Sequence, residues 1–393
     1  MSLTRLGWSV AVTSLALVGA AYLLGYPRVA VLGVGGLAAV AIGMAAVARR
    51  PRVTLSREIF PTRVPRGEPA VGMLRISNAS RIAGLRIEAR ERFGADEIAV
   101  PVPYLRAGAS REIGYPLPTS RRGVIEVGPL RWERADVLGL VRWQDAVAGR
   151  QVLFVHPRTH PFPLGAALRA QRWDSAVSDA APNGTITFHH LRDYVPGDDL
   201  RFIHWRSSAR LDTLMVRQNI DVALPRTTML LVTDESAYPD SEVFEEAVEV
   251  AASTLLAAAG QRLPARLVTS AGQVLAGSGG HDDARMFLDF LAGVELSGPA
   301  SAGSDAGLGR AVARLERAEG GGVLVAAAGT LDGTGLAMLR RLSARYDQTV
   351  VALLGTAAGA AGPGRNGADL AIAVLATPTA EQFCARWLEM ARR

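Results

Sequence analysis

The chain has 393 residues and a formal net charge of +6, and all 43 of its basic residues are arginine. A chain without lysine has no P-loop lysine, no lysine Schiff base and no Ser–Lys dyad, and these arginines form no basic and aromatic stripe of the kind that binds nucleic acid. Cys384 is the only cysteine, which excludes an internal disulfide and is typical of a reduced compartment.

Two uncharged apolar runs open the chain, at residues 6–27 and 29–48. Each is long enough to cross about 30 Å of hydrocarbon as a helix, so we predict a transmembrane hairpin within residues 1–50. A cleaved signal peptide is the alternative for the first run, because Gly19-Ala20-Ala21 offers small residues. A signal peptide needs no second apolar run, so the hairpin is favoured. The second run contains four glycines that either permit close helix packing or have no packing role: Gly33, Gly35, Gly36 and Gly43.

The arginines around these runs predict an orientation. Arg5 precedes the first run and only Arg28 lies between the two. Four more follow the second run: Arg49, Arg50, Arg52 and Arg57. By the positive-inside rule, both ends of the hairpin and everything after residue 50 are cytoplasmic. The expected location is the inner membrane, as a multi-pass protein.

Short alternating runs broken by Pro, Gly and Asn fill residues 51–157. They predict half-buried strands at 71–76, 85–90, 112–117 and 124–127, with turns at the spacing of a β-sandwich. Residues 158–183 are rich in Pro, Gly and Ala and are expected to be an irregular linker.

Residues 184–217 form a segment dense in Arg, Asp, His and aromatic side chains. Pro196-Gly197 fits the central positions of a type II turn, and Asp198 or Asp199 can cap a short helix beginning near Leu200. The arginines can fork onto the aspartates. The groups concerned are Arg192, Arg201, Arg206, Arg210 and Arg217 on one side, and Asp193, Asp198, Asp199 and Asp212 on the other.

The same segment reads F-x-x-L-R-D-Y-x-P-G-D-D-L-R-x-I-x-W-x-x-S-A-R from Phe188 to Arg210. This pattern resembles the signature of domain-of-unknown-function family 58, and further landmarks at 121–123, 128–130 and 136–140 extend the resemblance over most of the soluble portion. The departures are His204 and Arg206, where Asp and Lys are common. The resemblance implies a membrane anchor, a MoxR-type AAA+ ATPase as partner, and a transglutaminase-like membrane protein as a further partner. The residues expected to form the interaction site are Phe188, Leu191, Arg192, Asp193, Tyr194, Gly197, Asp198, Asp199, Arg201, Ile203, Trp205, Ser208 and Arg210.

Residues 218–393 alternate continuous apolar strands with helices. This pattern predicts a parallel sheet covered on both faces, and the family resemblance implies a von Willebrand factor type A-like α/β domain. The whole chain is therefore expected to be an α+β multidomain protein: a transmembrane hairpin, a β-sandwich, the signature segment and the α/β domain.

Type A domains often bind Mg²⁺ through D-x-S-x-S after the first strand. Here Asp234 and Ser236 occupy the first two positions, but Tyr238 replaces the final Ser, and the strand at 323–327 is followed by no Asp. We therefore expect Asp234 to cap the following helix and expect no cofactor. The histidines have no spacing typical of a zinc site, and no nucleophile elbow or dinucleotide fingerprint occurs in a suitable context.

Two interpretations of the signature stay open. In one, its Arg–Asp pairs and Trp205 form a buried network that fixes the β-sandwich onto the α/β sheet. In the other, the same residues present a docking face, since Arg and Trp are common interface anchors. The expected function is a non-enzymatic scaffold that acts in assembling or maturing envelope or redox complexes. The alternatives are a hydrolase-like enzyme using Asp198, Asp199 and His204, and a Mg²⁺-dependent adhesion module.

Overall fold

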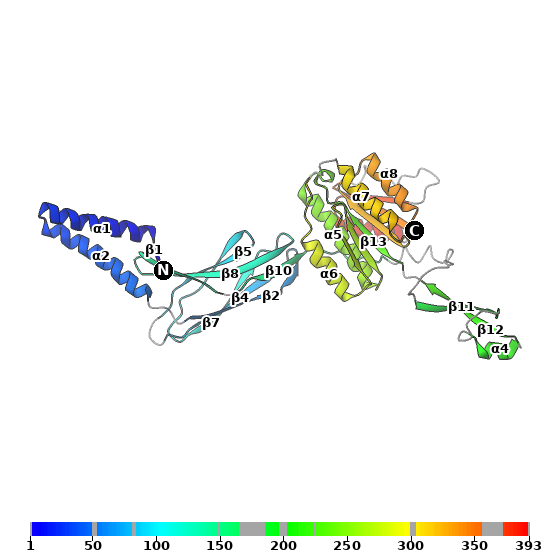
Figure 1. Ribbon diagram of the computed structural model, residues 1–393, viewed down its shortest axis with the longest axis horizontal. Coiled ribbons are helices and arrows are strands. Elements are labelled where there is room, and N and C mark those ends of the chain that lie inside the picture. Colours follow the sequence, from blue (N-terminus) through cyan, green and yellow to red (C-terminus); the bar gives the residue numbers. More distant parts are fainter. Residues whose placement is uncertain are drawn as a thin grey trace. The chain divides into compact units, whose positions relative to one another are not determined.

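The computed structural model describes residues 2–48, 53–80, 84–147, 149–164, 185–195, 203–211, 213–222, 225–298, 304–355 and 372–391. They belong to two compact units, Met1–His156 and Pro157–Arg393 (Figure 1). The mixed α/β architecture with two N-terminal apolar helices is confirmed.

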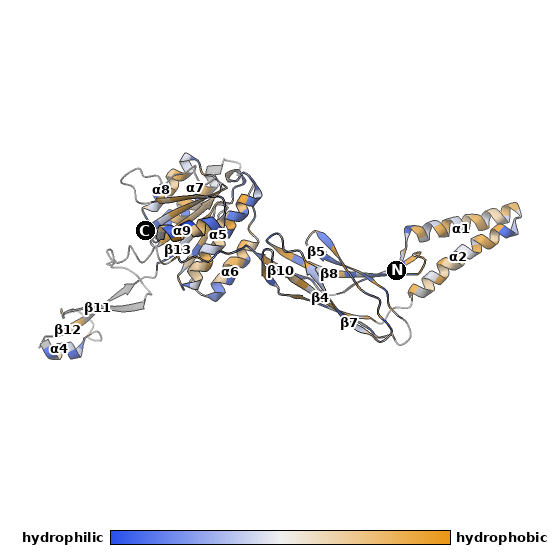
Figure 2. Cartoon of the chain, turned by 180° about the vertical axis from the view of Figure 1, so that it is seen from behind, coloured by the Kyte–Doolittle hydropathy of each residue, from blue (hydrophilic) through white to orange (hydrophobic). Residues whose placement is uncertain are grey.

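The first unit begins with a helical hairpin, α1 (Arg5–Leu24) and α2 (Pro27–Ala48). The turn is made by Gly25 at φ 69°, which costs a glycine little, and Pro27 takes the first helical position of α2. Both helices are long and apolar enough to cross a membrane, and Figure 2 shows that they are apolar along most of their length.

Small residues bring the two helices together. A methyl group added at Gly36 would clash with the Ser14 hydroxyl, and one at Gly33 would come 2.7 Å from the Ser14 carbonyl oxygen. Gly35 has no such neighbour, while Gly43 faces Asp136 and Val141 outside the hairpin. The glycines are therefore of three kinds: two pack the helices, one meets the β domain, and one points to open space.

A three-stranded and a seven-stranded sheet share one core in the rest of this unit. The three-stranded sheet runs β2 (Val53–Phe60), β4 (Ala70–Asn78), β7 (Ser110–Leu117). The other contains β1 (Ser2–Leu3), β9 (Val141–Val147), β8 (Gly123–Ala135), β10 (Gln151–His156), β3 (Arg63–Pro65), β5 (Glu88–Phe93) and β6 (Asp96–Val100). Leu74 and Ile76 from the first sheet pack with Leu130 and Leu153 from the second. The strand expected at 85–90 begins at Glu88, because Leu85 makes only an isolated bridge with Leu105.

The second unit contains a six-stranded sheet in the order β15-β14-β13-β16-β17-β18. The strands are β13 (Thr227–Leu231), β14 (Ala265–Thr269), β15 (Val274–Gly277), β16 (Val323–Ala328), β17 (Gln348–Leu354) and β18 (Ile372–Thr377). All pairs are parallel except β14–β15. Every residue of β13 and β16 is buried, as expected for strands covered on both faces. The strand order reverses between β13 and β16, the place where open α/β sheets bind ligands.

Five helices accompany this sheet: α5 (Ser241–Gly260), α6 (His281–Ala292), α7 (Ser304–Arg317), α8 (Gly333–Ser343) and α9 (Ala380–Ala391). The central one, α5, buries one whole side, including Phe244, Val250 and Leu255. The core that the helices and the sheet enclose is the larger of the two soluble cores in the described residues.

The linker expected at 158–183 is shorter than the sequence suggested. Phe162 and Leu164 are buried in the α/β core, and the Phe162 ring lies 5.4 Å from that of Trp387 on α9. The His160 backbone N–H also donates to Ser253 Oγ of α5 at 2.9 Å. Residues up to Leu164 therefore belong to the second unit, and 165–183 lie outside the described residues.

Candidate functional site

The signature segment forms a β-hairpin with a short helix. β11 (Thr185–Asp193) pairs antiparallel with β12 (Met215–Val222), with a bulge between Phe188 and His190. Between the strands lies α4 (Trp205–Leu211). Ile203 bridges to Val216, and the His204 N–H donates to the Met215 carbonyl oxygen at 2.8 Å. The start of α4 is thereby fixed to β12.

His204 caps this helix. Its Nδ1 accepts the Ser207 N–H at 3.2 Å and lies 2.8 Å from Ser207 Oγ, which places an acceptor on the third N–H of the helix. A carboxylate would make the same bond, which accounts for histidine where the family pattern has Asp. The expected caps, Asp198 and Asp199, and a helix start near Leu200 lie outside the described residues.

The inner face of α4 is held by a buried serine. Ser208 Oγ accepts the Met215 N–H at 2.9 Å and donates to the His204 carbonyl oxygen at 3.2 Å. Ile203 and Val216 are buried beside it. Two of the signature residues, Ile203 and Ser208, thus position the helix.

The outer face of α4 is exposed. Trp205 has 66% of its surface accessible, and Arg206, Ala209 and Arg210 are exposed with it. Leu214, at the start of the return strand, is also exposed. The first interpretation, in which Trp205 is buried between the β-sandwich and the α/β sheet, stays a prediction. The exposed Trp–Arg surface fits the docking interpretation.

The other signature positions are divided between strand, loop and undescribed residues. Asp193 is exposed and Tyr194 is half-buried, with its N–H bonded to the Leu214 carbonyl oxygen at 2.8 Å. Phe188, Leu191 and Arg192 lie on β11, where the backbone alone is described. Gly197, Asp198, Asp199 and Arg201 lie outside the described residues. Most of the expected Arg–Asp network falls on these positions and stays a prediction.

Residues 190–360 match a family model described as "Protein of unknown function DUF58". The chain contains a DUF58 domain. The matched region includes most of the hairpin, α4, and the α/β sheet through β17, so the DUF58 domain joins the exposed Trp205 surface to the parallel sheet.

Part of the chain is also similar to a bacterial protein whose name gives no activity. The chain is 30% identical over 175 residues to "Uncharacterized protein YeaD" of Bacillus subtilis (strain 168). The alignment covers 43% of this chain and 41% of the relative, so the chain spans less than half of that protein's length.

The loop after β13 carries the expected Asp234 and Ser236. Asp234 is buried, and its Oδ1 accepts the Ser236 N–H at 3.0 Å and the Ser236 hydroxyl at 2.7 Å, which caps the 3-10 helix η2 (Glu235–Ala237). This is the capping role favoured by the sequence. Across the sheet, the Thr330 N–H donates to the Ala237 carbonyl oxygen at 2.7 Å. The segment after β16, where the sequence lacks the Asp that a Mg²⁺ site would use, is thus joined to η2 by a backbone hydrogen bond.

Metal ligation has little support elsewhere in the residues that the structure describes. They contain no group of three His, Cys, Asp or Glu side chains suited to an ion. Beside Asp234 lies a hydroxyl cluster in which Thr233 Oγ1 is 3.0 Å from Ser270 Oγ and 3.1 Å from Ser297 Oγ. These bonds tie the ends of β13 and β14 together.

The single thiol is not an activated nucleophile. Cys384 is buried in α9, and burial raises the pKa of its thiol to about 12. A thiol with that pKa holds no appreciable thiolate at neutral pH. Nearby, burial also raises the pKa of Glu249, whose Oε2 lies 3.1 Å from His160 Nε2. Through His160, these contacts hold the segment that leads into the α/β unit against α5 and α9.

The β-sandwich contains a buried ion pair that the sequence did not indicate. Arg57 Nη1 lies 2.5 Å from Glu91 Oε1, and the Tyr115 hydroxyl donates to Glu91 Oε2. Burial raises the pKa of Glu91 to about 6, against the opposing effect of Arg57. The partners are 34 residues apart and lie on strands of two different sheets, β2 and β5, so only the packing of the sheets brings them together.

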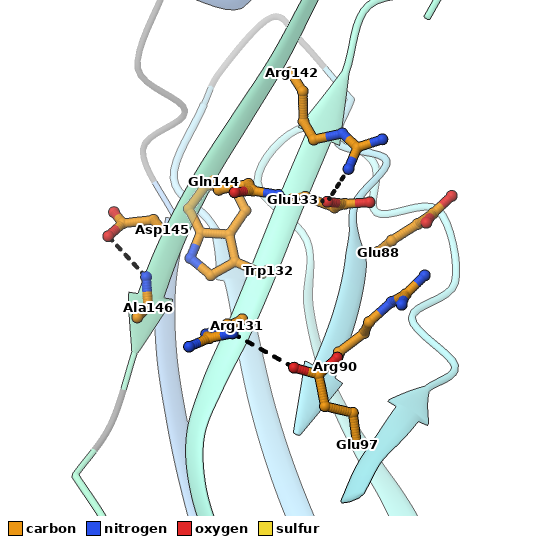
Figure 3. Close-up of a pocket in the computed structure, with 10 residues that line it drawn as sticks. All are labelled: Glu88, Arg90, Glu97, Arg131, Trp132, Glu133, Arg142, Gln144, Asp145 and Ala146. Atoms are coloured by element: carbon orange, nitrogen blue, oxygen red, sulfur yellow. Dashed lines mark hydrogen bonds and ion pairs between the residues drawn. The ribbon is translucent and has the colours of Figure 1, made fainter. Parts of the chain in front are cut away.

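The outer face of the seven-stranded sheet has a charged hollow of about 480 Å³ (Figure 3). Positively and negatively charged side chains are mixed in its lining. Arg131 Nη1 lies 3.4 Å from Glu97 Oε1, and Arg142 Nη1 lies 3.2 Å from Glu133 Oε2. Charges already paired across a solvated face favour no ligand of one sign. We assign the hollow no function.

Proposed function

We propose that this DUF58 chain is a membrane-anchored adaptor whose α4 surface docks a protein partner, and that it performs no chemistry of its own. The anchor is the α1–α2 hairpin. The arginines at its two ends, including Arg5 and Arg57, favour a cytoplasmic location for both soluble units at the inner membrane.

The observation that carries the proposal is the exposure of Trp205 on a helix whose inner face is fixed. A Trp held in the open by rigid backbone contacts loses little conformational freedom on binding. Arg206 and Arg210 flank it, and Trp and Arg are the side chains most enriched among interface hot spots. The surface suits a partner with an apolar pocket bordered by carboxylates.

The partner proposed is a MoxR-type AAA+ ATPase, with a transglutaminase-like membrane protein as a further component. The basis is the resemblance of residues 188–210 to the family signature. In this proposal the adaptor recruits the ATPase to the membrane, where the assembly or maturation of an envelope or redox complex takes place.

The α/β unit serves in this proposal as a von Willebrand factor type A-like carrier. Its support is the reversal of strand order between β13 and β16, with Asp234 directly after β13. Asp234 acts here as a helix cap, so the carrier works without Mg²⁺. The hydrolase alternative is less favoured, because His204 Nδ1, the ring nitrogen beside the Ser207 hydroxyl, already caps α4.

The test is co-purification from detergent-solubilised membranes of cells that express the chain with the ATPase. The wild-type chain should recover the ATPase, and Trp205→Ala should lose it. The matched control is Tyr104→Ala, which removes an equally exposed aromatic side chain from the β-sandwich. Equal recovery with all three chains would refute docking at α4.

A further inference from the structure

The loop between β8 and β9 carries two exposed aliphatic side chains at the foot of the apolar helices. Val137 is fully exposed and Leu138 exposes 59% of its surface. Single exposed aliphatic residues are common on soluble proteins and carry no meaning alone. Here the loop is joined to α1 and α2, so its tip has a defined position relative to them.

Thr4 joins the loop to the first helix. Its N–H donates to the Leu140 carbonyl oxygen at 3.0 Å, and its hydroxyl donates to the Gly139 carbonyl oxygen at 2.6 Å. The same hydroxyl accepts the Gly7 N–H at 3.0 Å, which caps α1. A methyl group at Gly7 would clash with the Leu140 carbonyl oxygen. One hydroxyl thus links the start of α1 to the loop.

The second helix meets the loop as well. A methyl group at Gly43 would lie 3.2 Å from an Asp136 carboxylate oxygen and 3.3 Å from Val141. Val40 and Val47 of α2 are buried with Leu140 and Val141 in a small core of their own. Both helices are therefore packed on the loop.

The strand register shows how the chain approaches α1. Ser2 pairs with Arg142 and Leu3 with Val141, antiparallel, so β1 runs alongside β9 toward the tip of the loop just before α1 begins. Gly7 and Gly43 lie within a turn or two of the helix ends at Arg5 and Ala48, or about 3–8 Å along the axis. With the helix ends at the membrane surface, as the proposed anchor requires, that depth corresponds to the boundary between headgroups and acyl chains.

Several backbone N–H groups of the loop have partners within the loop. The Asp136 carboxylate accepts the N–H groups of Leu138 at 3.2 Å and Val141 at 2.7 Å, and the Gly139 N–H donates to the Asp136 carbonyl oxygen at 3.0 Å. Each N–H group that is bonded within the loop lowers the cost of moving the loop from water into the membrane interface.

We propose that the β8–β9 tip, Val137 and Leu138, inserts into the lipid bilayer interface beside α1 and α2, as a third membrane contact of this chain. The inference rests on the proposed membrane anchoring of α1 and α2. Trp8 is exposed near the start of α1, and Trp is enriched at membrane–water interfaces. Three attachment points, rather than a hairpin alone, would fix the orientation of the β-sandwich on the membrane surface.

The test uses the full chain in phosphatidylcholine–phosphatidylglycerol vesicles, with an environment-sensitive fluorophore on Val137→Cys or Leu138→Cys. Quenching is measured with nitroxide lipids labelled near the headgroup end of the acyl chain and, separately, with aqueous iodide. Cys384 is buried, and the chain with no added cysteine measures its background labelling. Leu15→Cys on exposed α1 is the membrane control. Ala95→Cys, exposed in the β5–β6 turn at the far end of the same sheet, is the aqueous control.

Residues 137 and 138 should be quenched by the lipid nitroxide and protected from iodide, with blue-shifted emission, as residue 15 is and residue 95 is not. If residue 15 is quenched by lipid but 137 and 138 respond like 95, the loop proposal is overturned and the anchor stands. If residue 15 also responds like 95, the anchor proposal fails and the loop proposal fails with it.

Discussion

Removal of Arg57 should destabilise the β-sandwich far more than removal of an exposed arginine in the same sheet. In the folded chain, the side chains of Arg57 and Glu91 are 1% and 0% exposed, and Arg57 Nη2 also donates to the Gly149 carbonyl oxygen at 2.7 Å. Arg57→Met leaves a buried carboxylate that keeps the Tyr115 hydroxyl as a hydrogen-bond donor but loses its cationic partner. Breaking a buried pair in this way costs about 3–5 kcal/mol.

The matched control is Arg75→Met. Arg75 Nη2 lies 3.0 Å from Glu112 Oε1, but these side chains are 68% and 50% exposed. An exposed pair contributes about 0–1 kcal/mol. The two substitutions are chemically identical and differ in burial, so the difference between them measures the effect of burial.

The assay is hydrogen exchange of the full chain in detergent, followed in peptides from β4 and β5. A local destabilisation of about 3 kcal/mol speeds exchange by about 150-fold, and the Arg75 variant should change it by less than about fivefold. Adding Glu91→Gln to Arg57→Met should restore most of the protection, because the carboxylate is then replaced by a neutral amide that still accepts from Tyr115. Equal exchange in the two single variants would refute the reasoning.

Three further outcomes are expected. His204→Asp should keep α4 as protected from exchange as in the wild type, and His204→Ala should lower its stability by about 1 kcal/mol, because it removes the cap; unchanged exchange in the alanine variant would contradict the cap. Because the pKa of Glu91 is raised from 4.5 to about 6 in the folded chain, the stability that this group contributes is complete below about pH 4.5 and is lost as the pH rises through about 6. Glu91→Gln should remove that slope from denaturation curves measured across this pH range, and a slope identical to that of the wild type would assign it to other groups. Gly36→Val should weaken α1–α2 packing by about 1–3 kcal/mol through its clash with Ser14, while Gly35→Val should not; protease resistance of the hairpin in detergent distinguishes them, and equal resistance would contradict the packing.

The helical hairpin and the parallel sheet could be predicted because each is encoded locally. Uncharged runs long enough to span a bilayer specify helices, and the expected boundaries at 6–27 and 29–48 differ from those of α1 and α2 by a few residues. Continuous apolar stretches such as that of β16 specify buried parallel strands, since both faces are covered.

Contacts between residues that are far apart in the chain could not be predicted from the sequence. Arg57 and Glu91 pair because β2 and β5 belong to sheets that face each other across one core, which no local pattern encodes. The same holds for Thr4, whose hydroxyl reaches a loop 135 residues away.

The signature segment was identified from its sequence, but its geometry was not. A Trp among arginines fits a buried wedge and an exposed anchor equally well, so the sequence does not choose between the two. The capping by His204 did have a signal, since a side-chain acceptor three residues before Ser207 is the usual arrangement at a helix start.

The most direct test of the adaptor proposal is the affinity of the full chain, in lipid nanodiscs, for the purified ATPase. If α4 is the docking surface, Trp205→Ala should weaken binding by about 30-fold or more, the effect of losing a hot spot of about 2 kcal/mol. Tyr104→Ala should leave the affinity unchanged. An affinity for Trp205→Ala within about twofold of the wild type would contradict the proposal.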